Sequence, residues 1–124
     1  MKLDKPPVDF HTLDIDEGWV PAPGAAPGIE QKLLSGELDE IEKVGARTRL
    51  IRFLPGAVAP APFVHDYWEE VYLIQGELTV GNDAEGEGGV TYDPPSYACR
   101  PPGTYHGPFA SKAGCLFLEI QYYA

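Results

Sequence analysis

The chain has 124 residues, of which 44% are hydrophobic and 11% aromatic, and this is enough to fill the core of one domain. Its 14 glycines and 13 prolines disfavour long helices and favour short strands that are joined by turns. A formal net charge of −10 argues against nucleic acid as a partner, and no apolar run approaches the roughly 20 residues of a membrane span.

The first 28 residues are predicted to form an extended arm, because the segment WVPAPGAAPG at residues 19–28 is rich in proline and glycine. The arm is expected to pack on the body of the protein, which forms a single domain over residues 29–124. The apolar side chains that suggest this packing are Phe10, Leu13, Ile15 and Trp19.

Two segments after the arm carry apolar residues in alternating or nearly continuous runs bounded by glycine, a pattern typical of strands. They are IEQKLLSGEL at residues 29–38 and ARTRLIRFLPGA at residues 46–57, and a helix over residues 30–43 is the alternative for the first. The segment EEVYLIQGELTV at residues 69–80 predicts a hairpin with its turn at Gln75–Glu77.

The rest of the chain is predicted to contain an exposed acidic loop and further strands. The loop is NDAEGEGG at residues 82–89, and SYACRPPGTYHGPF at residues 96–109 reads as strand, turn and strand. The last segment, GCLFLEIQYY at residues 114–123, alternates cleanly. About six to nine short strands in one small domain indicate an antiparallel sandwich or barrel.

The alternation in the last segment separates two faces of a strand. One face carries Leu116, Leu118 and Ile120, and the other carries Cys115, Phe117, Glu119 and Gln121. The polar residues Glu119 and Gln121 either reach the barrel interior or meet solvent. Neither Cys99 nor Cys115 belongs to a CxxC pair, so both thiols are expected to be reduced and buried, with a redox pair as the alternative.

The chain has three histidines, and His65 and His106 are candidates for one metal site. His65 precedes Glu69 by four residues, so both side chains enter one cavity if the residues between them form a tight bend. The glycine of PPGTYH permits a turn that brings His106 back to this cavity. Two imidazoles and one carboxylate leave metal positions open for water or substrate, as in non-haem Fe(II) sites and also with Zn or Mn. Glu70 is expected to face solvent, although a one-residue shift in register would exchange it with Glu69.

Two motifs in this part of the chain resemble those of the cupin family. In PGAVAPAPFVHDYWEEVYLIQG at residues 55–76, His65, Glu69 and the closing glycine have the cupin spacing, and PPGTYH ends at His106. The segments HDYWEE, YACRPPGTYHGPF and GCLFLEI are similar to the ChrR type, the zinc-binding half of an anti-sigma factor, and to dihydroxyacetophenone dioxygenases. The resemblance covers about residues 45–121. It implies an all-β fold, the double-stranded β-helix or RmlC-like jelly-roll barrel. It also implies that one divalent metal ion is bound by His65, Glu69 and His106.

The chain departs from the cupin pattern at several positions. Phe63 stands where cupins have the first histidine of His-x-His, the spacer after Gly56 is one residue longer, and Ala110 stands where the second motif often ends in Asn. Three protein ligands where the family often has four predict weaker metal affinity and one more open coordination position. The alternative is that metal binding has been abandoned.

Four residues are candidates for contact with a substrate. Phe63 and Phe117 are expected to form apolar walls that exclude water. Arg100 either binds a carboxylate of the substrate or forms an exposed salt bridge with one of the 19 acidic residues. Glu119 joins them if its face of the last strand lines the interior.

The resemblance and the candidate residues support three hypotheses of function. The first is an oxygenase that acts on a small aromatic or diketone-like compound with a divalent metal, Fe(II) or Zn(II) before Ni(II) or Mn(II). The second is a zinc-binding sensory or regulatory module, and the third is a metal-free cupin that binds a small molecule. The resemblance also implies a homodimer, with the arm packed across the barrel or exchanged with a second subunit. The N-terminus MKLDKPPVDF lacks the apolar segment of a signal peptide, so a cytoplasmic location is expected.

Overall fold

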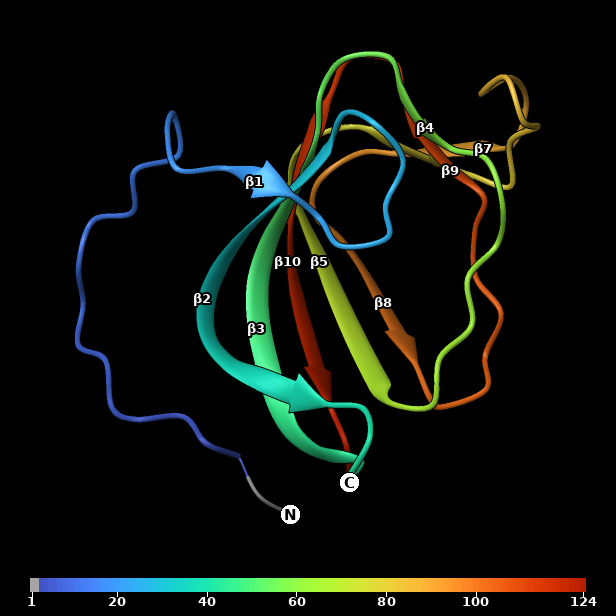
Figure 1. Ribbon diagram of the computed structural model, residues 1–124. Coiled ribbons are helices and arrows are strands. Elements are labelled where there is room, and N and C mark those ends of the chain that lie inside the picture. Colours follow the sequence, from blue (N-terminus) through green and yellow to red (C-terminus); the bar gives the residue numbers. More distant parts are fainter. Residues whose placement is uncertain (1–2) are drawn as a thin grey trace.

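The computed structural model describes residues 3–124, in which ten strands and no helix are formed (Figure 1). Residues 1 and 2 of the expected arm lie outside the described residues. The strands are β1 (Val20–Pro21), β2 (Ile29–Asp39), β3 (Val44–Phe53), β4 (Ala57–Ala59), β5 (Trp68–Gly76), β6 (Leu78–Val80), β7 (Val90–Tyr92), β8 (Ser96–Arg100), β9 (Phe109–Ser111) and β10 (Cys115–Tyr122). Within residues 3–124, no helix has the length and apolar character of a membrane span.

The strands form two antiparallel sheets that together make the predicted double-stranded β-helix, an RmlC-like jelly roll. The larger sheet has the order β1-β2-β3-β10-β5-β8 and the smaller one β4-β9-β6-β7. Figure 1 shows the long strands side by side, with β4, β7 and β9 at one end of them. The predicted all-β fold is confirmed, and residues 29–39 form a strand rather than the alternative helix.

The hairpin predicted for residues 69–80 is wrong. β5 pairs with β10 and β8 in the larger sheet, whereas β6 pairs with β7 and β9 in the smaller one. Gly76, with a φ of 80°, turns the chain from one sheet into the other instead of reversing it. In the sequence, a hairpin and a crossing between two sheets both appear as a glycine between two strands. Only the strands with which β5 and β6 pair distinguish the two.

The core lies between the two sheets and is filled from alternate positions of the strands. In β10 the residues are buried and half-buried in strict alternation, as predicted. Cys115, Phe117, Glu119 and Gln121 are on the buried face, so the two polar residues reach the interior. The apolar part of the core consists of Ala22, Ile29, Ile51, Phe53, Ala57, Ala59, Val71, Leu73, Leu78, Phe109, Cys115 and Phe117.

Both cysteines are free, but only one is buried. Cys115 lies in the core, whereas Cys99 is exposed, so the burial predicted for it is wrong. Cys99 lies in β8, at the edge of the larger sheet, and pairs with Glu70, whose carboxylate accepts hydrogen bonds from two half-buried or exposed tyrosines. Both residues therefore point to the outer face, away from the core.

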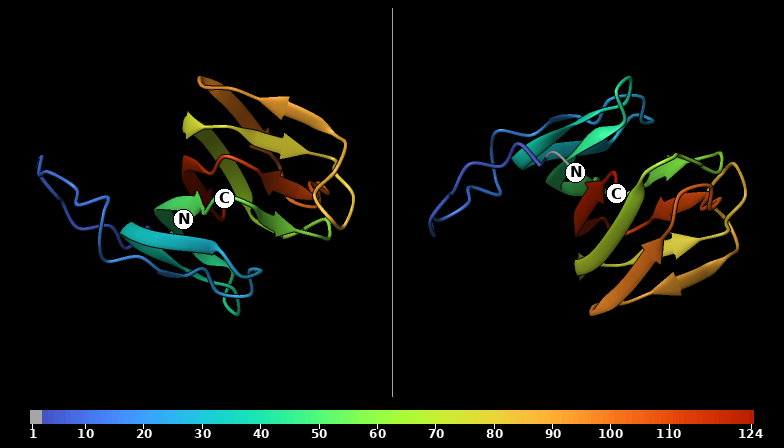
Figure 2. Two further views of the ribbon diagram at one scale, coloured as in Figure 1. Left: turned by 90° about the horizontal axis from the view of Figure 1, so that it is seen from above. Right: turned by 90° about the horizontal axis from the view of Figure 1, so that it is seen from below.

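The middle of the arm loops out from the strands, while its two ends contact the larger sheet (Figures 1 and 2). Phe10 is fully exposed within the chain, and Leu13 and Ile15 are exposed as well, which corrects the expected packing of these three side chains on the body. Trp19 does contact the larger sheet, because the guanidinium of Arg52 lies 4.5 Å from the centre of its ring. Lys5 donates a hydrogen bond of 2.6 Å to the hydroxyl of Thr48. The division at residues 28 and 29 stays a prediction.

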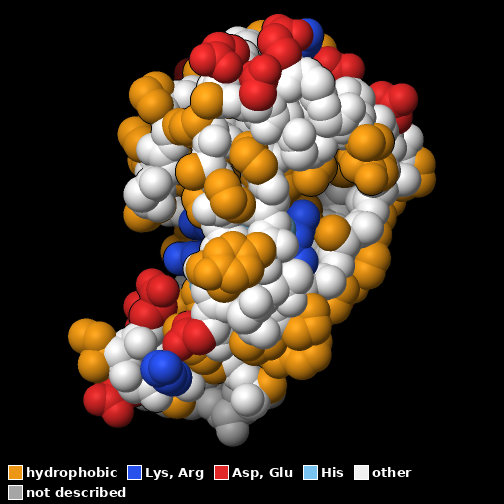
Figure 3. All heavy atoms as spheres, turned by 90° about the vertical axis from the view of Figure 1, so that its right-hand side faces the viewer, with side chains coloured by type: hydrophobic (Ala, Val, Ile, Leu, Met, Phe, Trp, Pro, Cys, Tyr) orange, Lys and Arg blue, Asp and Glu red, His pale blue; other side chains and the backbone are white. Residues whose placement is uncertain are grey.

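Most of the acidic loop between β6 and β7 is exposed, as predicted, although Asn82 and Gly86 are buried. The carboxylate of Asp83 accepts hydrogen bonds from the backbone N–H groups of Glu85 and Glu87, which hold the loop in a tight turn. Figure 3 shows acidic side chains at the top of one face and again at its lower left, with hydrophobic side chains across its middle.

Gly76→Ala tests whether close approach of the backbone fixes the crossing between sheets. A Cβ at this position would collide with the carbonyl oxygen of Gly114 and lie 2.7 Å from the Cα of Cys115. We expect the free energy of unfolding in urea to fall by more than about 3 kcal/mol. Gly81→Ala is the matched control, because Gly81 has the same φ of 80° and no atom within 4 Å. The control should lose only about 1–2 kcal/mol, the cost of the left-handed conformation. Equal losses in the two variants would contradict the explanation.

Candidate metal centre

A bend before β5 and backbone hydrogen bonds between two loops bring together the side chains of His65, Glu69 and His106. Bends at residues 66 and 67 place His65 beside Glu69, the second residue of β5. Phe63 and His106 exchange two backbone hydrogen bonds of 2.7 and 3.0 Å, which bring the loop before β9 to the loop before β5. A further bond of 2.9 Å runs from the Gly103 N–H to the carbonyl of His65.

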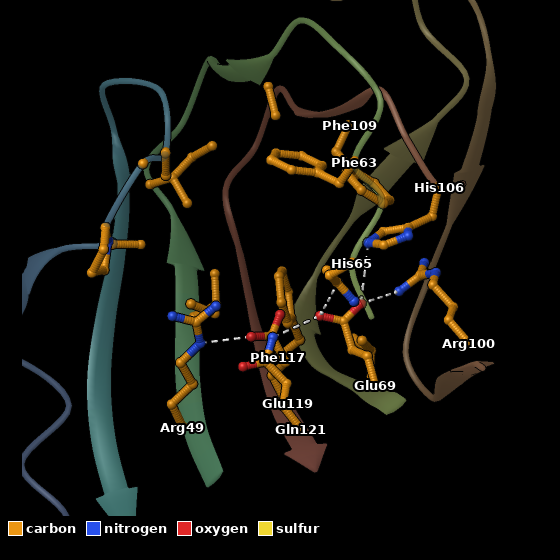
Figure 4. Close-up of a pocket in the computed structure, with 18 of the residues that line it drawn as sticks. Arg49, Phe63, His65, Glu69, Arg100, His106, Phe109, Phe117, Glu119 and Gln121 are labelled. Carbon is orange, nitrogen blue, oxygen red and sulfur yellow. Dashed lines mark hydrogen bonds and ion pairs between the residues drawn. The ribbon is translucent and has the colours of Figure 1, made fainter. Parts of the chain in front are cut away.

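The three side chains converge on one point in the cavity (Figure 4). The Nε2 of His65 lies 3.6 Å from Oε1 of Glu69, and the Nε2 of His106 lies 3.3 Å from Oε2. One ligand atom from each residue lies within 4.8 Å of the others, and this is the candidate metal cluster in the described part of the chain. The tight bend expected between His65 and Glu69 is present.

The orientation of both imidazoles fits a metal ion. The Nδ1 of His106 lies 3.0 Å from the carbonyl oxygen of Thr104, and the Nδ1 of His65 lies 3.4 Å from that of Tyr67. We assign the proton of each neutral ring to Nδ1, because only a donor makes a favourable contact with a carbonyl. The lone pair of each ring is then on Nε2, directed at the cluster. Metal-binding histidines are commonly held in this way.

Glu69 is the buried centre of the cluster, with 4% of its surface exposed. Gln121 Nε2 donates to its Oε1 at 3.0 Å, and Arg100 Nη1 donates to its Oε2 at 3.1 Å. Burial alone would raise the pKa of Glu69. When the imidazoles are protonated, hydrogen bonds from His65 and Gln121 and the positive charges of both rings lower this pKa to about 2. The carboxylate is therefore ionised, the form that binds a metal.

A row of polar residues crosses four neighbouring strands of the larger sheet. Arg47 in β3 pairs with Gln121 in β10, Gln121 with Glu69 in β5, and Glu69 with Arg100 in β8. Side chains in the row are bonded in the same order, because Arg47 donates to the amide oxygen of Gln121 and the amide nitrogen donates onward to Glu69. The row fixes the position of Glu69 from both sides.

A second carboxylate lies beside this row. Glu119 accepts a hydrogen bond of 2.6 Å from Arg49 Nε, while Arg49 Nη1 donates to Gln31. Burial, followed by the negative charge of Glu69, raises the pKa of Glu119 to about 7, and the Arg49 guanidinium only partly opposes this. Two carboxylates of different protonation therefore share one cavity.

The cluster opens into a cavity of about 300 Å³. Phe63, Phe109 and Phe117 line it together with the polar row. Figure 4 shows Phe63 and Phe109 on one side of the cluster and Arg49, Glu119 and Gln121 on the other. The rings of Phe63 and His106 stack at 6.0 Å between centres, so the cavity has one aromatic and one charged side.

The structure places all seven predicted site residues at this cavity: Phe63, His65, Glu69, Arg100, His106, Phe117 and Glu119. One alternative predicted an exposed salt bridge for Arg100. Arg100 does form a salt bridge, but with the buried Glu69, and the Arg100 side chain is only 15% exposed. Sequence reasoning missed Arg47 and Arg49. They share the inward face of β3 with the buried Ile51 and Phe53, so the period of two was the signal that could have found them.

An antiparallel jelly roll with a His–Glu–His cluster in its cavity is the architecture of a cupin. The family model of the ChrR cupin-like domain matches residues 9–122. The chain belongs to this family, and the match begins within the arm. A comparison with curated protein sequences gave no match.

Several solved structures share the fold. The acetylacetone dioxygenase of Acinetobacter johnsonii matches with a TM-score of 0.67 and 22% identity over 94% of this chain and 75% of that one. KdgF from a Halomonas species has a TM-score of 0.65 and 19% identity over 94% and 96% of the two chains. An RmlC-like cupin of Shewanella frigidimarina has a TM-score of 0.64 and 16% identity over 98% and 96%. At these identities the likeness establishes the fold alone.

Glu119→Gln tests the protonation of the second carboxylate in the metal-free protein. Because the native pKa of about 7 lies above the ordinary 4.5, the contribution of Glu119 to stability is complete below pH 4.5 and is lost as the pH rises through 7. The parent protein should lose up to about 3 kcal/mol of unfolding free energy between pH 4.5 and pH 8 that the variant retains. Glutamine keeps an oxygen that accepts from Arg49. Urea unfolding at both pH values measures this, and the same pH dependence in both proteins would refute it.

Proposed function

We propose that the protein is a metal-dependent cupin enzyme, an oxygenase of a small aromatic or diketone-like compound. The observation that carries this proposal is the convergence of two imidazole Nε2 atoms and one ionised carboxylate at a cavity with an aromatic wall. His65, Glu69 and His106 would hold one divalent ion, with Fe(II) as the ion for this reaction and Zn(II), Ni(II) and Mn(II) as the others that the donor set accepts. The acetylacetone dioxygenases among the structural neighbours support the choice of substrate.

Each side of the cavity has a role in this proposal. When bound, Fe(II) supplies a Lewis acid and a redox centre for the reaction of O₂ with a small molecule. Phe63, Phe109 and Phe117 exclude water from the aromatic side and pack against the apolar part of the substrate. Gln121 and Arg100 orient the carboxylate of Glu69.

Two other functions have specific support. The ChrR name of the family favours a zinc-binding sensory or regulatory module. The ion pair between Arg100 and Glu69 satisfies the carboxylate without a metal, and this favours a metal-free binding protein. Elemental analysis of purified protein and oxygen uptake with diketones and catechols separate the three. A sensor binds zinc without turnover, and a metal-free protein retains no transition metal after reconstitution. The homodimer and the cytoplasmic location stay predictions. Sedimentation at micromolar concentration tests the first of them.

Glu69→Gln should abolish metal binding. Loss of an outer partner of a ligand costs about 10–100-fold in metal affinity, so loss of the ligand itself should cost at least as much. Glu70→Gln is the matched control, because the neighbouring carboxylate faces the other side of the sheet and accepts from Tyr97 and Tyr122. Zinc titration by calorimetry compares the variants with the parent. Loss of affinity in the control and not in Glu69→Gln would place the site elsewhere.

Phe63→His should strengthen metal binding, because it adds an imidazole beside His106, with which Phe63 forms a backbone bridge. We expect zinc affinity to rise at least about tenfold. Oxygen uptake should fall, since the new ligand takes a position that substrate uses. Thermal melts recorded beside the titration show whether the variant is folded. Unchanged or absent zinc affinity in both proteins, with a lower melting temperature of the variant, would contradict the three-ligand centre.

A further inference from the structure

Arg100 and a metal ion at the candidate centre would share one partner, the carboxylate of Glu69. It is the last residue of β8, and its side chain reaches across to β5, where Nη1 donates to Oε2 of Glu69 at 3.1 Å. The same Oε2 lies 3.3 Å from the Nε2 of His106, on the side where the metal ligands converge. One oxygen atom therefore faces both the arginine and the candidate metal centre.

The guanidinium cannot simply turn to water. Its side chain is 15% exposed, and its Cζ lies 5.4 Å from the centre of the Phe109 ring, on the opposite sheet. Glu69 is the one acidic partner that the structure records for Arg100 within residues 3–124. The other buried carboxylate, Glu119, is held by Arg49. When Glu69 ligates a cation, its charge is shared, and Arg100 is left as a poorly solvated cation without a full partner.

The charges around the cavity show what that partner should be. The lining contains three arginines, Arg47, Arg49 and Arg100, and three acids, Glu40, Glu69 and Glu119. The acids in this lining therefore do not outnumber the arginines, and a divalent ion adds two positive charges to it. A neutral ligand leaves this excess uncompensated inside a partly buried cavity, whereas an anion reduces it.

We infer that the small molecule bound at this centre is an anion, and that Arg100 receives its carboxylate after Glu69 has ligated the metal. This inference rests on the proposed metal site and narrows its substrate class to diketones or catechols that carry a carboxylate. The two oxygens of such a compound face the metal, and its carboxylate takes the N–H groups of Arg100 that Glu69 releases. Arg100 is thus a specificity-determining residue for the charge of the substrate.

Two matched pairs of compounds test the inference by binding alone. They are 3,4-dihydroxybenzoate with catechol, and 2,4-dioxopentanoate with acetylacetone, each pair differing in one carboxylate. Calorimetry with the Zn(II)-loaded protein avoids turnover, and the zinc content measured after each titration excludes extraction of the metal. We expect the carboxylate compound to bind at least about tenfold more tightly in at least one pair, since a hydrogen-bonded charge pair contributes this much. The metal-free protein should show a smaller preference. By linkage, the anion should tighten zinc binding by the factor by which zinc tightens binding of the anion.

Variants assign the preference to the residue. Arg100→Gln should remove it while zinc still binds, and Arg100→Lys should retain part of it. Arg52→Gln is the matched control, because Arg52 also pairs with a glutamate, Glu30 at 2.7 Å, but does not line the cavity. If Arg100→Gln fails to fold, the preference of the parent and of Arg100→Lys decides.

The outcomes separate the inference from the proposed function. A protein that binds zinc but shows no preference for the anion, or binds neither compound, refutes the inference and leaves the metal site standing. An equal preference without metal refutes the release of Arg100 by ligation. A protein that binds no metal refutes the proposed function itself.

Discussion

The structure depends on one constraint, the compensation of the buried carboxylate of Glu69. An ionised carboxylate that is removed from water is costly unless donors and positive charges replace the solvent. Here four side chains do so: His65, Arg100, His106 and Gln121. They come from two loops and two strands, so the carboxylate connects segments that are distant in the sequence. These partners outweigh the effect of burial and lower the pKa of Glu69 to about 2, so the carboxylate is ionised.

The donors that compensate the charge of Glu69 are in place only in the observed register of the strands. Arg47, Gln121, Glu69 and Arg100 form one row only in the observed pairing of β3, β10, β5 and β8. A shift of one residue in β10 or β8 would turn Gln121 or Arg100 to the outer face and remove one of the donors to Glu69. The alternative register would also bury the outward-facing residues of the same strand. The polar row therefore specifies the fold as well as the site.

The sequence predicts those parts of the structure that depend on local patterns. The period of two in residues 114–123 predicts β10 and its two faces. The cluster of His65, Glu69 and His106 is predicted through the resemblance of two separate motifs to those of cupins. Features that depend on distant partners are not accessible in the same way. The crossing at Gly76 looks like a hairpin until the partners of β5 and β6 are known. Cys99 is exposed because it lies on the outer face of β8, and which face of this strand is the outer one depends on its pairing with β5.

The replacement of a cupin histidine by Phe63 has a consequence for the shape of the cavity. Phe63 stacks on His106 and on Phe109, at 6.0 and 6.2 Å between ring centres, and extends an apolar wall up to the candidate metal cluster. Arg49, Glu119 and Gln121 lie on another side of the cluster (Figure 4). A ligand that satisfies both sides has a flat apolar body against the aromatic rings and polar oxygens toward the row. Phe63 thus stands at the position of a cupin imidazole and adds an apolar surface to the cavity there.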